Sequence, residues 1–129
     1  MNQTPTRETE PAAAVVQRQL DAYNARDVDA ILATYAADAE QFEYPETLLA
    51  RGVAQLRERF AARFTEPNLR ATLLHRIVVG STVIDHERVT RMFPEGPGTI
   101  ELVAIYEVRD GKIAQARFIA GPKHVHAQP

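Results

Sequence analysis

The chain has 129 residues, 45% of them hydrophobic and 25% charged, which is enough apolar material for the core of one globular domain but not of two. Fifteen basic and seventeen acidic residues leave a formal charge of -2, so no overall field attracts nucleic acid or an anionic membrane. The absence of cysteine excludes disulfides and thiolate metal sites, and it suits a reducing compartment.

The two ends of the chain are polar. Residues 1–11, MNQTPTRETEP, lack the basic and then apolar order of a secretion signal, and we interpret them as a disordered N-terminal tail. Residues 12–121 are expected to form a single domain, and residues 122–129 a C-terminal tail. No apolar run approaches the roughly 18 residues of a membrane span. We therefore expect a cytoplasmic protein with no membrane or nucleic-acid partner.

Three helices are predicted in the first half of the chain. Apolar residues recur at helical spacing over residues 12–24, and a second short helix follows Asp27, which is placed to cap it. A third helix begins at Val53 and ends before Pro67.

Strands are predicted on either side of the third helix. The stretch from Glu40 to Tyr44 reads as a strand that Pro45 interrupts, and 48–50 as a brief second strand. After the third helix only strand patterns follow, separated by turn signals. These four long strands are Ala71 to Val79, Val83 to Phe93, Thr99 to Val108 and Lys112 to Ala120. Helices followed by an antiparallel meander predict an α+β fold.

Several stretches of the chain resemble a known family. The segment YNARDVDAILATYAADAE, then Pro45, RGVAQLRERF and a final YEVRDGKIAQARFI, is similar to the nuclear transport factor 2-like superfamily, in its SnoaL-like, ketosteroid-isomerase-like branch. The resemblance covers residues 12–121. It implies a cone-shaped fold, three N-terminal helices on a curved, mainly antiparallel sheet, an apolar cavity, and a homodimer through the outer sheet face. This scaffold serves isomerases, cyclases, dehydratases, epoxide hydrolases and proteins that only bind.

The resemblance also suggests site residues. It places the general base of the isomerase at Glu43, although aligning on Pro45 would put Tyr44 there, and a one-residue shift reverses the face of a strand. The two proton donors of the isomerase match Gln19 and Ala104, so neither the tyrosine nor the neutral carboxylic acid is present. Tyr23, one helical turn after Gln19, offers a phenol instead.

Strand alternation predicts which other side chains share a cavity with Glu43. His75 and His86 are expected to face inward, so the candidate catalytic residues are Glu43, Tyr23, His75 and His86. Histidines in such positions are, however, more often satisfied core or rim residues than catalysts. Small residues in the last strands either leave room for a ligand or allow close packing. The predicted pocket-lining residues are Gln19, Ile100, Leu102, Ala104, Tyr106, Ala116 and Phe118.

The opposite face of the 83–93 strand is predicted to be the outer one. It carries Asp85, Glu87 and Arg91, with Val89 and Phe93 between them. This face is expected either to be solvated or to form a self-complementary interface across a two-fold axis. Val103, Ile105 and Gln115 would extend that surface.

Two classes of function are open. The first is a cofactor-independent isomerase, lyase or hydrolase that transfers protons on a small apolar metabolite, with Glu43 as base and Tyr23, His75 or His86 as hydrogen-bond donors. The second is a non-catalytic module for small-molecule binding or dimerisation. No histidine spacing suggests a metal site. The first class requires Glu43 and one imidazole to converge on an open cavity.

Overall fold

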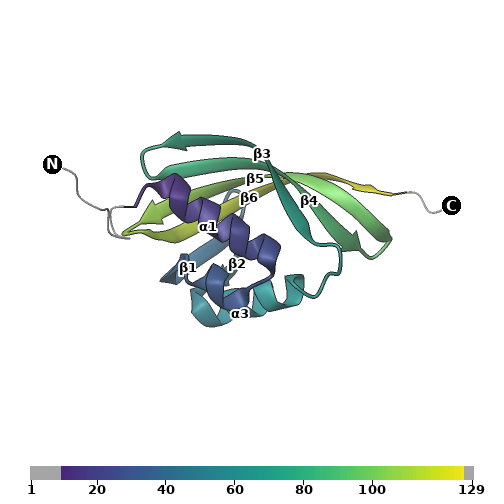
Figure 1. The fold of residues 1–129 in the computed structure, drawn as a ribbon, viewed down its shortest axis with the longest axis horizontal. Helices are drawn as coiled ribbons and strands as arrows, with labels where there is room; N and C mark the ends of the chain where they lie inside the picture. The colour runs from purple at the N-terminus through teal and green to yellow at the C-terminus, as the bar shows by residue number, and fades with distance from the viewer. Residues whose placement is uncertain (1–9, 127–129) are drawn as a thin grey trace.

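The computed structural model describes residues 10–126, so most of the predicted N-terminal tail lies outside the described residues. Within them, three helices pack against one six-stranded sheet (Figure 1). The strand order is β2-β1-β6-β5-β4-β3, with β1 parallel to β6 and the other neighbours antiparallel. The predicted α+β class and mainly antiparallel sheet are confirmed. The elements are α1 (Ala12–Ala25), α2 (Val28–Leu32), β1 (Tyr35–Glu43), β2 (Thr47–Arg51), α3 (Gly52–Arg63), β3 (Arg70–Val79), β4 (Thr82–Phe93), β5 (Gly96–Arg109) and β6 (Lys112–Val125).

The break between α1 and α2 forms as expected. Arg26 adopts a left-handed conformation, and the Asp27 carboxylate then accepts a hydrogen bond of 3.0 Å from the Ala30 N–H, which caps α2. The first strand starts earlier than the predicted Glu40, because the YAADA segment, residues 35–39, already belongs to it. This segment begins β1, where Tyr35 pairs with Ile113 of β6. Pairing with a distant strand overrides the local helical spacing.

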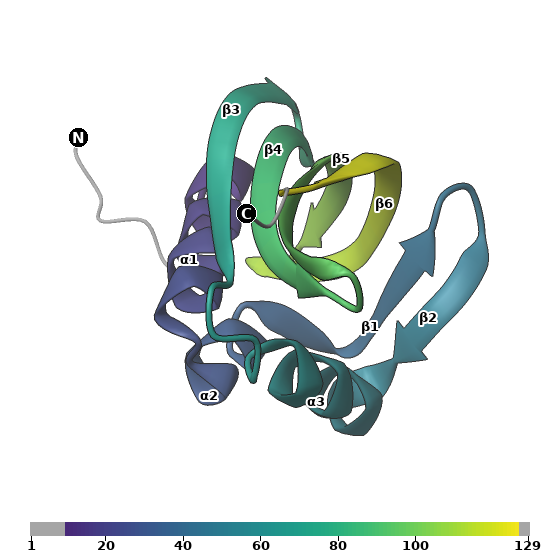
Figure 2. The ribbon, with the colours of Figure 1, turned by 90° about the vertical axis from the view of Figure 1, so that its right-hand side faces the viewer.

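The sheet bends, and the helices lie inside the bend. Figure 2 shows α1 beside β3, and α3 beneath β1 and β2. Helix α1 contacts β3 to β6, whereas α3 contacts β1 and β2. The core between these layers is built from fully buried aliphatic side chains, among them Val15, Ile31, Leu56, Val83 and Ile113.

The inner face of β4 differs from the prediction. Val83, Asp85, Glu87 and Val89 are buried, so the residues assigned to the outer face point into the molecule. The reason is a buried partner for one of the acids. Arg76 of β3 makes two hydrogen bonds to the Asp85 carboxylate, of 2.7 and 2.9 Å.

The Arg76 side chain ties three elements together. Besides the pair with Asp85 in β4, its Nη1 donates to Gln17 Oε1 of α1 at 2.9 Å. The side chain of Asp85 is 0% exposed and that of Arg76 16%. The hydrogen bonds that Arg76 donates to Asp85 raise the pKa of Arg76, although burial of the guanidinium group acts to lower it. The pair therefore anchors α1 on the sheet.

The last strand is longer than predicted. β6 continues through Val125, and Lys123, His124 and Val125 pair with Ile100, Thr99 and Gly98 of β5. Residues 122–125, expected in a C-terminal tail, therefore extend the sheet. No helix of residues 10–126 is long and apolar enough to cross a membrane.

We expect Arg76→Met to lower the free energy of unfolding by about 3 kcal/mol, because it leaves the Asp85 carboxylate buried without a counter-ion. Urea denaturation near neutral pH measures this. The control is Arg109→Met, which breaks the exposed pair with Asp38 and should cost about 1 kcal/mol or less. An Arg76→Met loss no larger than that of Arg109→Met would show that the buried pair does not anchor the fold.

Candidate functional site

A cavity of about 610 Å³ opens between α1, α3 and the inner face of the sheet. Its size suits a small organic molecule. Two of the predicted lining residues lie elsewhere, because Ala104 and Ala116 are 0% exposed in the packed core. Their small size therefore serves close packing. The predicted residues that do line the cavity are Gln19, Tyr23, Glu43, Ile100, Leu102, Tyr106 and Phe118.

The most buried carboxyl group of the cavity wall belongs to Glu87. Its residue is 6% exposed, and within residues 10–126 no hydrogen bond to its carboxyl group is formed. Burial and, to a smaller extent, the negative charge of Asp85 together raise the pKa of Glu87 to about 7, although the positive charge of Arg76 opposes part of this rise. Near neutral pH this group is therefore able both to give and to accept a proton.

Two phenols face the same cavity and remain protonated. Burial raises the pKa of Tyr106 and of Tyr35 well above the usual tyrosine range, and the charge of Glu87 adds to both shifts. Tyr106 Oη donates to Gln19 Oε1 at 3.3 Å, and Tyr35 Oη accepts from Gln41 Nε2 at 3.3 Å. These distances are long for hydrogen bonds, so both phenols are able to turn toward a bound molecule.

Arginines form the wall contributed by α3 and the end of β4. Arg91 is engaged by Glu66 through hydrogen bonds of 2.6 and 3.2 Å. Burial alone would raise the pKa of Glu66, but the hydrogen bonds from Arg91 and the Met92 N–H lower it overall. Arg59 donates to Gln41 Oε1 at 3.1 Å. Arg63 lies 3.5 Å from the Tyr23 hydroxyl.

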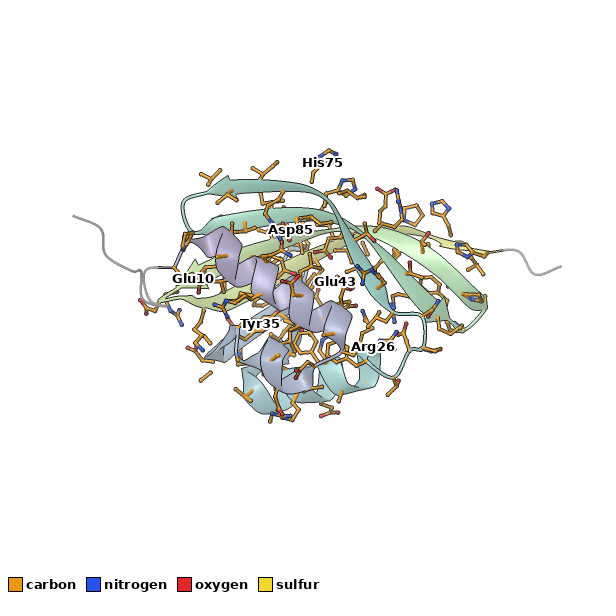
Figure 3. All side chains as sticks on the ribbon, in the orientation of Figure 1. Glu10, Arg26, Tyr35, Glu43, His75 and Asp85 are labelled. Carbon is orange, nitrogen blue, oxygen red and sulfur yellow. The ribbon has the colours of Figure 1, made fainter. Side chains whose placement is uncertain are left out.

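Glu43 and the two histidines do not come together as predicted. Glu43 lines the cavity but is exposed at the end of β1, whereas Tyr44 is not part of the lining. His75 and His86 lie outside the cavity, and their rings stack with centroids 5.9 Å apart. His86 Nε2 lies 2.7 Å from the Glu101 carboxylate. Figure 3 shows His75 beyond β3, away from α1.

The inward orientation predicted for His86 was wrong because the other face of β4 is buried, whereas that predicted for His75 was wrong for a local reason. The register between β3 and β4 shifts between Leu73 and His75, which is a bulge. It places Leu73 opposite Glu87 but Arg76 opposite Asp85, so the alternation reverses and His75 faces outward opposite His86.

The cavity residues that were missed from the sequence include Glu87, Tyr35, Gln41 and Arg59. One signal for Glu87 is present. Apolar residues alternate along β4 at Val83, Val89 and Phe93, with the same parity as both acids. No signal in the sequence identifies Gln41, which lies at the bulge between β1 and β2.

Metal ligands do not gather in the described part of the chain. In residues 10–126 no group of three or more histidine, aspartate or glutamate side chains is arranged to hold a metal ion.

The raised pKa of Glu87 predicts a pH-dependent contribution to stability. Because the folded state prefers the protonated carboxyl, its contribution is complete below about pH 4.5 and is lost as the pH rises through about 7. The neutral variant Glu87→Gln should therefore gain stability relative to the wild type, by about 3 kcal/mol between about pH 4 and about pH 9.

Urea denaturation of both proteins across this pH range measures the difference. Glu58→Gln, on the exposed side of α3, controls for the loss of one acidic side chain. A difference between wild type and Glu87→Gln that stays constant with pH would contradict the raised pKa.

The chain is similar to a known protein family and to several solved structures. The family model of the SnoaL-like domain matches residues 16–116. A comparison with curated proteins found no match. Among solved structures, an uncharacterised cystatin-fold protein from Novosphingobium aromaticivorans has a TM-score of 0.78 and 27% identity, over 85% of this chain and 98% of that one.

Two enzymes share the fold. The epoxide hydrolase/cyclase-like enzyme SalBIII, with a role in pyran ring formation in salinomycin, has a TM-score of 0.76 and 21% identity, over 85% of this chain and 90% of that one. An LEH-like epoxide hydrolase of M. tuberculosis has a TM-score of 0.72 and 16% identity, over 85% and 82%. At these identities the likeness concerns the fold. The match over residues 16–116 places the chain in the SnoaL-like domain family, as its resemblance predicted.

Proposed function

We propose that the protein is a cofactor-independent enzyme that transfers protons on a small, largely apolar molecule, and that Glu87 carries the proton. The observation that supports this most strongly is a carboxyl group that is buried in the wall of an open cavity and has a pKa of about 7. Structural carboxylates of this kind usually have a counter-ion or hydrogen-bond donors, as Asp85 does. Glu87 has neither arrangement within residues 10–126.

The reaction class that best suits these groups is the opening of an epoxide by water or by a hydroxyl of the same molecule. Protonated Glu87 gives its proton to the epoxide oxygen as the ring C–O bond breaks. The attacking oxygen forms the new C–O bond and releases its proton through water, which restores Glu87. Tyr35 and Tyr106 stabilise the developing alkoxide by hydrogen bonds. The epoxide hydrolase/cyclase-like enzyme SalBIII and the LEH-like epoxide hydrolase share the same fold, which supports this class.

This proposal changes the role expected for Glu43. Its exposed place in the cavity lining suits a second carboxylate that takes the proton from the attacking water and passes it through solvent back to the buried Glu87. A non-catalytic binding module is the alternative. It would use the same cavity without any requirement for the unpaired carboxyl of Glu87.

We also propose that the protein forms a homodimer through the outer sheet face, with residues that differ in part from those predicted. Asp85 and Glu87 are buried, so they cannot take part in such an interface. The outer side instead carries a row of paired residues, Ile77, Ile84 and Ile105, of which Ile77 is 58% exposed. Exposed apolar rows of this kind are frequent at protein interfaces.

We expect Glu87→Gln to lower the turnover of small epoxides about 100-fold or more, because the amide cannot donate the proton. The measurement is diol or cyclic ether formation from a panel that includes styrene oxide and hydroxy-epoxides. The wild-type rate should fall above about pH 7, since the protonated carboxyl is the active form, and this fall should be absent in Glu87→Gln.

Three further measurements separate the outcomes. Glu58→Gln should retain wild-type turnover. If Glu43→Gln abolishes turnover while Glu87→Gln retains it, the proton belongs to Glu43 instead. Absence of turnover across the panel by the wild type, together with binding of panel members in the cavity, would contradict the enzyme proposal and favour the binding module.

A further inference from the structure

Arg59 is a cation of the cavity wall that has no anionic partner in the described residues 10–126. It lies on the inner side of α3, half-buried, and its Nε donates to the neutral amide of Gln41. Among residues 10–126 no carboxylate forms an ion pair with it, and its two terminal nitrogens have no protein acceptor. A guanidinium taken partly out of water in this way normally has an acceptor for its donors.

A second arginine strengthens the positive charge at this place. Arg63 follows Arg59 by one helical turn and lines the same cavity. Its nearest contacts are long, 3.6 Å to Glu66 and 3.5 Å to Tyr23, because Glu66 is engaged more closely by Arg91. Burial and the charge of Arg63 lower the pKa of Arg59, and an anion between the two guanidinium groups would stabilise the charged form of both.

The remaining arginine of α3 shows what an ordinary surface position looks like. Arg57 is exposed, and its Nη2 lies 2.9 Å from the Asp29 carboxylate of α2. Arg57 therefore carries the same charge as Arg59 and lies on the same helix, but it is not part of the cavity lining. The lack of a partner at Arg59 is thus a property of the cavity wall rather than of α3 as a whole.

We propose that Arg59, supported by Arg63, binds the carboxylate of the substrate, so that the substrate is a small apolar acid. The inference rests on the proposed function for the reaction that the substrate undergoes, and it concerns how the cavity recognises that substrate. A carboxylate matches the two free nitrogens of one guanidinium in a bidentate pair. The apolar body would lie against Ile100, Leu102 and Phe118, which line the same cavity.

A singly charged group suits the site better than a dianion. The carboxyl groups of Glu43, Glu66 and Glu87 also line the cavity, and they would repel a phosphate more strongly than a carboxylate. The apolar residues on β5 and β6 favour a hydrocarbon body over a sugar or nucleotide.

Calorimetric titration with matched probes tests this recognition without requiring turnover. The probes are 2-naphthoate, 2-naphthamide and 2-naphthyl phosphate, which share one apolar body. The wild type should bind naphthoate about tenfold or more tightly than naphthamide, because only the acid makes charge-assisted hydrogen bonds. Arg59→Gln should remove this preference, Arg59→Lys should retain part of it, and Arg57→Gln should leave it unchanged.

Glu87→Gln separates this inference from the proposed function. It should bind naphthoate at least as tightly as the wild type, even though it is expected to lose turnover. Circular dichroism confirms that each variant is folded. The proposal is overturned if no probe binds, if naphthamide or the phosphate binds as tightly as naphthoate, or if folded Arg59→Gln keeps the preference. Equal losses in Arg57→Gln would also overturn it, since they would reflect the net charge.

Discussion

The inner face of β4 carries two acids that the fold removes from water, and their different environments shape the rest of the molecule. Asp85 is held by Arg76 in a bidentate pair that also contacts Gln17 of α1, so its charge is compensated and the helix is attached to the sheet. Glu87, two residues further on the same face, has no such partner within residues 10–126. One acid therefore stabilises the packing, and the other remains available at the cavity.

The proximity of the two acids matters for the chemistry. The fixed negative charge of Asp85 adds to the effect of burial on Glu87, and the counter-charge of Arg76 offsets only part of it. The ion pair that anchors α1 thus also raises the pKa of its neighbour. The ion pair between Arg76 and Asp85 and the reactive carboxyl of Glu87 are in this way linked through β4. A substitution of Arg76 is therefore expected to change both the stability of the fold and the pKa of Glu87.

The sequence predicted the regular parts of the fold. Alternation in β5 correctly predicted that Leu102 and Tyr106 face the cavity, because β4 and β5 pair without a bulge from Thr82 to Phe93. The same reasoning failed in β3, where the bulge after Leu73 reverses the faces and sends His75 outward. Such a bulge has no mark in the local composition.

The site itself was predictable only in part. Acids in a strand normally indicate a solvated face, and the burial of Asp85 depends on an arginine nine residues away that reaches it only through the register of two strands. Glu43 was identified from its position in the first strand, and it does line the cavity, but its exposed place could not be read from the alternation. Arg59 was not identified from the sequence, because a basic residue in an amphipathic helix normally lies on its solvent-exposed side.

The account depends on the protonation state of one carboxyl group in the folded protein. Carbon-detected NMR of protein labelled at the glutamate side-chain carboxyl carbon follows that group through a pH titration, and the resonance absent from Glu87→Gln assigns it. A midpoint of about 7 for Glu87 is the predicted result. A midpoint near the ordinary value of 4.5 would contradict the account, because the carboxyl would then be ionised at neutral pH and unable to donate a proton.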